Sequence, residues 1–305
     1  MKQALHKQAD VAESITCIFG HVNSSPDPVV ITENGYLGRR CQQCGLIYIS
    51  PRPTLDEIIN IYSHDAAHTN LESFLRTSAF RRYCASHSLR LLSRYIKSGI
   101  LLEIGAGIGT FSEQAKKKGF ISKAIEPNEK EAAYIRSREV PCEWRPLREA
   151  FPGESFDAIY HCDVLSHLYD PISETKLMTE RLRPGGVLMF ETGNFADVDE
   201  RYRQHIKLFQ YPDHLFFFGQ LTLRELLRRS GLKLVLMRFY NRLPEFLLAS
   251  KSGKARDSQV CSSSQSDWKG ISKQYARYLL AYRIGRMLPF KNMPGTVIVI
   301  ARKAH

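Results

Sequence analysis

The sequence Ile100-Leu-Leu-Glu-Ile-Gly-Ala-Gly-Ile-Gly109 decides the fold of this chain. Its first five residues predict a short buried strand, and its glycines precede a stretch through Lys118 that has the period of a helix. Glycines at this position let a ligand approach the backbone closely where a helix begins. The order of strand, glycine turn and helix therefore indicates a site for a nucleotide-like ligand, although structural turns also use such glycines.

Glu126 ends the next predicted strand, 121–126, and supports the ligand interpretation. One carboxylate at this place can accept hydrogen bonds from both hydroxyls of a ribose. The glycine spacing is GxGxG rather than GxGxxG, and Glu103 lies two residues before the first glycine. Both features argue against a dehydrogenase that binds a pyrophosphate. A surface turn beside an exposed glutamate is the alternative. It is disfavoured because Glu126 follows the glycine turn at the spacing expected of a ribose-binding acid.

An alternating pattern of strands and helices extends from this turn in the C-terminal direction. Alternation of this length predicts a parallel sheet that is covered by helices on both faces. The last two predicted strands are expected to pair in antiparallel fashion, with a Ser-rich loop near 250–267 and a helix near 271–288 between them. The predicted strands are 100–104, 121–126, 142–144, 156–161, 187–191, 232–240 and 296–301, and the predicted helices include 128–138, 170–182 and 221–230.

Four potential metal ligands lie in the first fifty residues. His21 follows Cys17 after three residues, and two residues separate Cys41 from Cys44. Three thiolates and one imidazole at these spacings permit a tetrahedral zinc site. The alternative is a module without metal, in which Cys41 and Cys44 are buried thiols.

The pattern becomes helical after residue 53. Thr54 and Glu57 predict a capping box at a helix N-terminus, and a second helix is expected over 71–97. We therefore expect a small metal-binding module at 1–53, a helical connector at 54–98, and an α/β domain at 99–305 with an insertion at 250–294.

The composition places the chain among globular proteins. It has 305 residues, of which 43% are hydrophobic and 24% charged, which excludes a disordered chain. No apolar run approaches the roughly 20 residues that span a bilayer. No secretory signal is recognised before Ser14, and seven cysteines are an odd set, so reduced thiols in a cytoplasmic protein are expected.

The net charge of +12 is concentrated in one part of the chain. Residues 251–305 contain eleven Lys and Arg and only two Asp, so they carry +9 of this charge. Such a basic segment suits either a nucleic acid or an anionic small molecule, and the charge alone does not separate the two.

Five motifs in order resemble those of class I S-adenosylmethionine-dependent methyltransferases. The resemblance covers about 99–240, and the segment 214–231 is similar to the small-molecule branch of that family. It implies a Rossmann-like α/β fold with a seven-stranded, mostly parallel sheet whose last strand is antiparallel, and S-adenosyl-L-methionine as cofactor. The motifs are Glu103–Gly109, Glu126-Pro127, Phe156-Asp157, Asp163–Leu168 and Leu182–Gly186.

The N-terminal residues add a second resemblance. The segment 41–54 is similar to the end of a zinc-ribbon-like module that precedes some bacterial sugar and natural-product methyltransferases. Those modules usually have a second cysteine where this chain has Gly20, so His21 is expected to take the fourth place around Zn²⁺. We expect this chain to lack the long C-terminal domain of the sugar C-methyltransferases, so their substrate is not carried over to it.

The family resemblance also implies a set of cofactor contacts. Glu103 is expected near the amino acid end of the cofactor, Glu126 at the ribose, and His161 nearer the adenosyl part. The full set is Glu103, Gly105, Ala106, Gly107, Gly109, Glu126, Pro127, His161, Asp163 and Leu165.

Three histidines are candidates for a catalytic base, and the role is assigned to His167 and His214 because His161 is expected nearer the adenosyl part of the cofactor. Methyl transfer from a sulfonium needs a base only when the nucleophile is a hydroxyl or a carbon acid. His167 follows the fourth strand and His214 precedes an aromatic run, and the alternative for each is an ordinary packing histidine. Ser166 stands where the family commonly has a glutamate, which argues against a catalytic metal.

The function that we expect is methylation of a small molecule, such as a sugar, a glycan or a natural-product intermediate, on oxygen or carbon. The helix near 271–288 is basic, and it is either a cover helix with its cations in solvent or a cap that attracts an anionic or phosphorylated acceptor. A nucleic-acid methyltransferase that uses the ribbon and this helix is an alternative, disfavoured because Asp163-Val-Leu-Ser replaces an Asn-Pro-Pro-Tyr-like motif. A non-catalytic binding protein with a cofactor fold is the second alternative.

Overall fold

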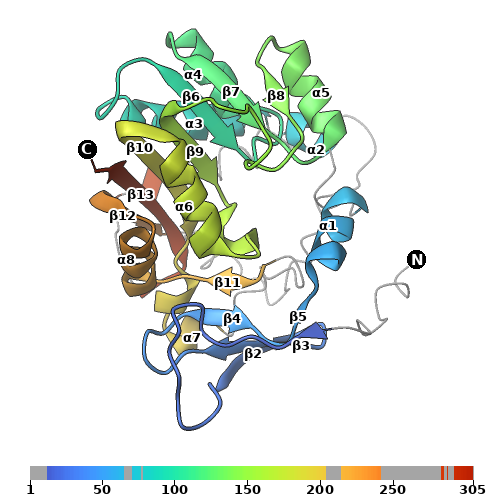
Figure 1. The fold of residues 1–305 in the computed structure, drawn as a ribbon, viewed down its shortest axis with the longest axis vertical. Coiled ribbons are helices and arrows are strands. Elements are labelled where there is room, and N and C mark those ends of the chain that lie inside the picture. Colours follow the sequence, from blue (N-terminus) through green and yellow to red (C-terminus); the bar gives the residue numbers. More distant parts are fainter. Residues whose placement is uncertain are drawn as a thin grey trace.

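The computed structural model describes residues 12–64, 71–76, 78–203, 214–241, 283–284, 287 and 292–304. Figure 1 shows an α/β domain with a smaller β module beside it. The loop expected near 250–267 and most of the helix expected near 271–288 lie outside the described residues.

A seven-stranded sheet forms the centre of the α/β domain (Figure 1). Its strands are β6 (Ile100–Ile104), β7 (Ile121–Ile125), β8 (Cys142–Glu143), β9 (Phe156–Cys162), β10 (Leu182–Gly193), β12 (Leu232–Asn241) and β13 (Gly295–Lys303). Their spatial order is β12-β13-β10-β9-β6-β7-β8. The strands from β10 to β8 are parallel, whereas β13 is antiparallel to both β10 and β12. The predicted mostly parallel sheet with an antiparallel last strand is confirmed.

Helices cover both faces of this sheet. Apolar residues of α3 (Ser78–Leu92) and α4 (Thr110–Lys117) form one buried cluster with β6, β9 and β10, and α5 (Glu129–Ser137) packs on β7 and β8. On the opposite face, α6 (Pro171–Arg181) and α8 (Gln220–Arg229) pack on the same strands together with residues of the β module. Burial of these apolar surfaces is the main favourable contribution to folding.

The helix boundaries follow from local capping. The Asn128 side chain accepts hydrogen bonds from the backbone of Lys130 and Glu131, and Asp170 caps α6 in the same way through Ser173. Within the range 71–97, where one helix is expected, the structure describes α2 (Leu71–Arg76) and α3, and α3 ends at Leu92, before the expected end. After Leu92 the N–H groups of Arg94 and Tyr95 bond to carbonyls three residues before, so the backbone tightens into turns and the regular helix stops.

The β module contains a second sheet, whose strands are β2 (Val29–Glu33), β3 (Tyr36–Arg40), β4 (Ile47–Ile49) and β11 (Phe216–Phe217). The order is β11-β4-β3-β2, and every neighbouring pair is antiparallel. The strand β11 comes from the chain after β10, so the α/β domain supplies one edge of this sheet. A separate pair joins β1 (Ala12–Glu13) to β5 (Arg52–Pro53).

The connector begins with the predicted capping box. The backbone N–H of Thr54 donates to the Glu57 carboxylate at 2.8 Å, and the N–H of Glu57 donates to the Thr54 hydroxyl at 3.4 Å. The helix α1 (Leu55–His64) follows. The short elements that complete the description are η1 (Leu165–His167), η2 (Phe195–Asp197) and α7 (Glu200–Arg203).

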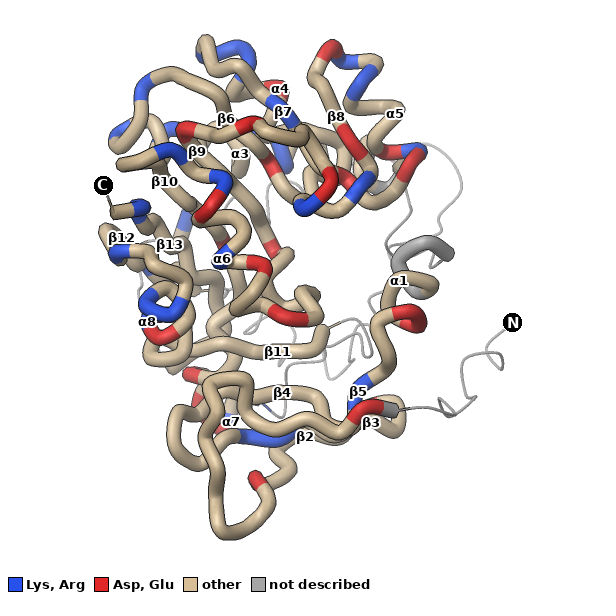
Figure 2. The backbone as a smooth tube through the Cα atoms, in the orientation of Figure 1, with Lys and Arg blue, Asp and Glu red and all other residues tan. Residues whose placement is uncertain are grey.

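Charges are mixed over the described part of the α/β domain. Figure 2 shows basic and acidic positions interleaved along α4, α5, α6 and α8. This mixture agrees with the small excess of positive charge before residue 251. Within the described ranges, each helix is too short or too polar to cross a lipid bilayer.

Candidate active site

The glycine turn lies at the carboxyl ends of the central strands, where open α/β sheets bind ligands. The N–H groups of Gly105 and Ala106 donate to the Ile125 carbonyl at 2.9 and 3.2 Å, which fixes the turn against β7. Gly105 has a φ of +67°, and a Cβ atom there would lie 2.5 Å from the Val164 side chain. The turn therefore touches the segment after β9, and glycine is required at this contact.

The Glu126 carboxylate joins this turn to the start of α5. One oxygen accepts the Gly107 N–H at 2.7 Å, and the other accepts the Asn128 N–H at 3.0 Å. The residue is 7% exposed, and burial raises the pKa of its carboxyl. Each carboxylate oxygen can accept a further hydrogen bond, so the geometry still allows contacts to ligand hydroxyls. Pro127, the next residue, is exposed beside it.

Glu103 lies on the inner side of the turn. Its carboxylate accepts hydrogen bonds from the Ser112 N–H at 2.9 Å and from the Ser112 hydroxyl at 2.6 Å. Burial raises the pKa of this carboxyl to about 8, and the nearby charge of Glu126 adds to the effect. The hydrogen-bond donors to Glu103 therefore belong to α4. Its expected contact with the amino acid end of the cofactor stays a prediction.

The segment that follows β9 faces the glycine turn. Asp163 is exposed and has a φ of +55°, which is uncommon for a residue other than glycine. Its N–H donates to the Glu191 carbonyl at 2.9 Å, and this bond holds the unusual conformation. Leu165, two residues later, is buried.

His161 occupies a different environment from the one we expected. Its ring is stacked on Phe190 with centroids 5.1 Å apart, and the residue is 1% exposed. Burial lowers the pKa of His161 to about 3, so the ring is neutral at physiological pH. This side chain is a packed core group rather than a group on the surface of the site.

The two candidate catalytic histidines lie against each other. The centroids of the His167 and His214 rings are 4.2 Å apart, and the His214 ring is parallel to Phe217. The Leu215 N–H donates to the Ser166 carbonyl at 2.8 Å, which joins the two histidine segments through their backbones. The chain thus brings together two imidazoles that are distant in the sequence.

The predicted metal ligands also come together. The ligand atoms of Cys17, His21, Cys41 and Cys44 all lie within 4.8 Å of one another. The Cys17 sulfur is 3.6 Å from the Cys44 sulfur and 3.4 Å from the His21 Nδ1 atom, which is 3.5 Å from the Cys41 sulfur. Tetrahedral zinc, with bonds of about 2.3 Å to sulfur and about 2.0 Å to nitrogen, separates neighbouring ligands by about 3.5–3.8 Å. The donor set therefore fits this ion.

The sequence did not indicate one charged residue that lies near Asp163, beside the glycine turn. Arg81 of α3 lies close enough to Cys162, Glu131 and Asp163 for their charges to raise its pKa, although the loss of hydration lowers the pKa more strongly. The guanidinium group also lies over the Phe74 ring at 4.3 Å. Nothing in the local pattern of the connector distinguishes Arg81 from the other arginines there.

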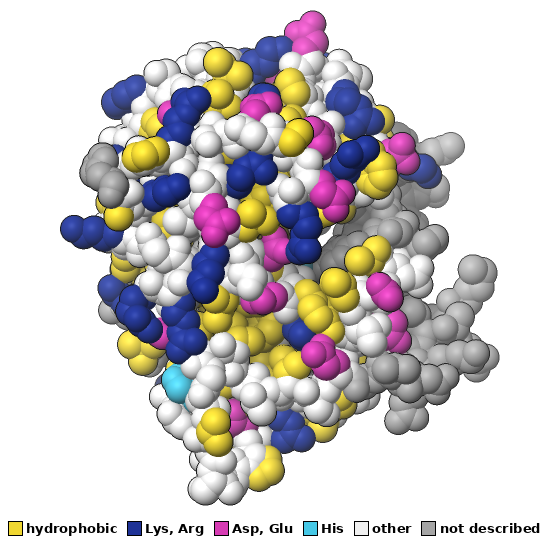
Figure 3. Space-filling model, in the orientation of Figure 1, with side chains coloured by type: hydrophobic (Ala, Val, Ile, Leu, Met, Phe, Trp, Pro, Cys, Tyr) yellow, Lys and Arg dark blue, Asp and Glu magenta, His cyan; other side chains and the backbone are white. Residues whose placement is uncertain are grey.

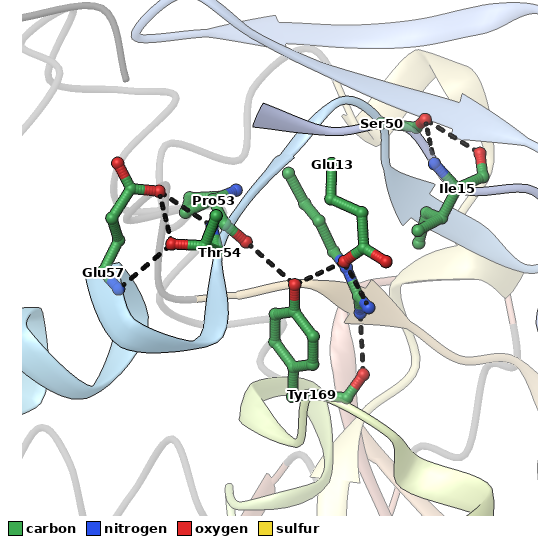
Figure 4. Close-up of polar contacts among 8 residues, drawn as sticks. Glu13, Ile15, Ser50, Pro53, Thr54, Glu57 and Tyr169 are labelled. Atoms are coloured by element: carbon green, nitrogen blue, oxygen red, sulfur yellow. Dashed lines mark hydrogen bonds and ion pairs between the residues drawn. The ribbon is translucent and has the colours of Figure 1, made fainter. Parts of the chain in front are cut away.

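A second missed group links the β module to the segment after η1 (Figure 4). Arg52 forms an ion pair with Glu13 at 3.0 Å and donates to the Tyr169 carbonyl at 2.7 Å. The Tyr169 hydroxyl donates to the Glu13 carboxylate and to the Pro53 carbonyl. These residues are far apart in the sequence and belong to no motif.

The molecular surface is hollowed in two places. Figure 3 shows apolar side chains gathered in a recess between α6 and the β module. A hollow of about 550 Å³ lies elsewhere, beside α7 and the start of α8. Because Arg40, Arg203 and Gln220 line it and no residue of the glycine turn does, this hollow is separate from the candidate cofactor site.

Comparisons with known proteins agree with this geometry. A family model described as "Methyltransferase domain" matches residues 75–236. The chain is 32% identical over 128 residues to the ubiquinone biosynthesis O-methyltransferase of Paramagnetospirillum magneticum, which covers 39% of this chain and 51% of that protein. It is 28% identical over 130 residues to the corresponding protein of Caulobacter vibrioides, covering 40% of this chain and 50% of that one. The chain thus spans about half the length of the curated relatives that it matches.

A solved structure supports the fold. Phosphoethanolamine N-methyltransferase 2 of Haemonchus contortus, bound to phosphomonomethylethanolamine and S-adenosylhomocysteine, aligns with a TM-score of 0.52 and 16% identity. The alignment covers 85% of this chain and 63% of that one. At this identity the likeness concerns the fold alone.

Proposed function

This chain belongs to the methyltransferase domain family, and on that premise we propose that it transfers the methyl group of S-adenosyl-L-methionine to a small molecule. The observation that carries the proposal is the glycine turn bridged by Glu126, at the carboxyl ends of β6 and β7. Such a turn with a carboxylate beside it can bind a nucleoside.

The cofactor residues have complementary tasks in this proposal. Gly105, Ala106 and Gly107 let the backbone pass under the cofactor, and Gly109 begins the helix whose N-terminus faces it. Glu126 accepts the ribose hydroxyls while it keeps its bonds to the backbone. Asp163, at the end of β9, lines the site opposite the turn together with the backbone near Leu165.

The chemical step requires alignment more than acid catalysis. In methyl transfer the nucleophile displaces a neutral thioether in line, so the leaving group needs no proton. Holding nucleophile, methyl carbon and sulfur in line can contribute several kcal/mol. When the nucleophile is a hydroxyl, a neutral imidazole of His167 or His214 accepts its proton. The contact between the rings gives that proton two acceptors in one place.

The acceptor in our proposal is a sugar, a glycan or a natural-product intermediate. The relatives named for ubiquinone biosynthesis are O-methyltransferases, which favours oxygen over carbon as the methylated atom. The recess between α6 and the β module, with its apolar side chains, offers a place for such a molecule (Figure 3). The idea of an anionic acceptor rests on the basic C-terminal residues, most of which lie outside the described ranges.

We also propose that the β module binds Zn²⁺. Cys17, Cys41 and Cys44 would supply thiolates and His21 an imidazole nitrogen. With four protein ligands the ion would have no open position, so its role is to cross-link the module rather than to take part in the reaction.

The test combines binding with product identification. We expect calorimetric titration with S-adenosyl-L-methionine to release heat, and cofactor with a deuterated methyl group to label the small-molecule fraction of a cell extract. Label in the RNA or DNA fraction would instead support the nucleic-acid alternative. A folded protein that gives no heat would support the non-catalytic binding protein.

A further inference from the structure

We propose that Arg52 is a positioning residue. It attaches the segment that contains His167 to the β module and thereby fixes the place of the His167 ring. This inference rests on the proposed function, because it assumes that His167 lies in the acceptor site. Arg52 is in β5, three residues after β4 ends at Ile49, and it is distant from both histidines in the sequence.

The guanidinium group of Arg52 is held firmly on the module side. The residue is 7% exposed, and its nitrogens lie 3.0 and 3.1 Å from one oxygen of Glu13, its cross-strand partner in the β1–β5 pair. The carboxylate offsets the buried positive charge, and its own pKa is lowered, first by the Tyr169 hydroxyl and then by Arg52. A buried charge needs such a partner to be tolerated.

The same group reaches the segment after His167. The remaining terminal nitrogen of Arg52 donates to the Tyr169 carbonyl at 2.7 Å, and the guanidinium carbon lies 3.6 Å from the centre of the Tyr169 ring. It also lies 6.0 Å from the centre of the Phe216 ring, in the strand after His214. One side chain thus contacts the segments of both histidines.

A backbone connection runs parallel to this contact. The Ile49 N–H of β4 donates to the Leu215 carbonyl at 3.0 Å, and the Leu215 N–H donates to the Ser166 carbonyl at 2.8 Å. The η1 turn is therefore fixed on one side through Leu215 and on the other through Arg52. Without Arg52, the turn keeps the backbone connection through Leu215 and the Tyr169 hydroxyl contacts to Glu13 and Pro53, but it loses the charged donor on the Tyr169 carbonyl, and its opening becomes easier.

The experiment compares Arg52→Met with a matched control. Methionine keeps an unbranched side chain but removes all donors, whereas Arg148→Met removes an exposed arginine that pairs with Glu174 on α6. In Arg52→Met we expect amide hydrogen exchange in residues 163–170 to become about tenfold faster, the size of effect that one charge-assisted hydrogen bond supplies. We expect the imidazole signals of His167, assigned with His167→Ala, to shift in the NMR spectrum. Arg148→Met should change neither.

Two further variants separate positioning from general stability. Arg52→Lys keeps a charge beside Glu13 but cannot also reach the Tyr169 carbonyl in the same geometry, so partial restoration of the exchange rate is expected. Tyr169→Phe removes the hydroxyl contacts but leaves the carbonyl bond, so less than a threefold change is expected. Faster exchange spread over the whole sheet in Arg52→Met, or exchange equal to that of Arg148→Met, would overturn the inference.

A titration with S-adenosylhomocysteine distinguishes this inference from the proposed function. Both Arg52→Met and the unaltered protein are expected to bind this molecule with the same affinity, because Arg52 does not touch the glycine turn. If Arg52→Met binds S-adenosylhomocysteine and its amide hydrogen exchange equals that of the unaltered protein, the positioning role is wrong but the proposed function stands. If the unaltered protein does not bind S-adenosylhomocysteine, the proposed function is wrong instead.

Discussion

Replacement of Glu126 by glutamine is the most direct test of the cofactor site. Both carboxylate oxygens already accept a backbone N–H, from Gly107 and from Asn128, and they would each accept a ribose hydroxyl in addition. An amide has one acceptor oxygen and one NH₂ donor, so either orientation turns a donor toward one of these backbone donors. The substitution therefore removes the charge from both ribose bonds and loses one bond within the protein.

The expected size follows from these contacts. Hydrogen bonds to charged groups contribute about 1.5–3 kcal/mol and neutral ones about 0.5–1.5 kcal/mol, so the total loss is about 2–3 kcal/mol. This corresponds to a dissociation constant for S-adenosyl-L-methionine that is about 30- to 150-fold higher in Glu126→Gln. Glu129→Gln, which alters an exposed glutamate at the start of α5, is the control and should stay within about twofold.

Calorimetry at two pH values makes the test more specific. Because burial raises the pKa of Glu126, the carboxylate is lost as the pH falls through this raised value. Affinity of the unaltered protein should therefore fall on acidification, and Glu126→Gln should lack this component. A folded Glu126→Gln protein with less than a threefold change in affinity would refute the assignment of Glu126 to the ribose.

Three further predictions concern other parts of the molecule. Since the folded-state pKa of Glu103 is about 8 and the ordinary value is 4.5, the folded state holds the proton more tightly, and stability falls as the pH rises between these values. Between pH 6 and 8 the unaltered protein should lose about 2 kcal/mol of unfolding free energy that Glu103→Gln keeps, measured by urea denaturation; equal slopes would contradict this. Cys44→Ser, or treatment with a strong chelator, should lower both the zinc content and the melting temperature, and Cys84→Ser is the control whose zinc content should not change. His167→Ala should slow methyl transfer by about 10²- to 10⁴-fold at unchanged cofactor affinity, and unaltered turnover would remove His167 as the base.

The central sheet could be predicted because its inner strands, such as β6 and β9, are buried on both faces. Runs such as Ile100–Ile104 are nearly continuous in apolar residues, and the helices between them begin at recognisable caps such as Asn128. The strand β10 is longer than the expected 187–191, because pairing with β9 resumes on the far side of the Pro184–Gly186 turn, where the register shifts. A tertiary contact of this kind leaves no periodic signal.

The parts of the site that could be predicted are those whose residues lie close together in the sequence. The glycine turn and the spacing of Cys41 and Cys44 have short sequence signatures, and the structure gathers the four expected metal ligands. Contacts over long separations were not predictable. The approach of His167 to His214 depends on the Leu215–Ser166 bond, and the side chain of His161 lies inside the core because its strand is buried on both faces.

The pairing of β4 with β11 has a consequence for synthesis of the protein on the ribosome. The metal-binding residues and β4 emerge early, but their sheet lacks an edge strand until Phe217 has been made. Until then β4 presents unpaired N–H and C=O groups, which are a template for pairing with other chains. If the module binds Zn²⁺ as proposed, metal bound to the nascent chain would order it during this interval, and metal supply during translation would then change how much of the protein aggregates.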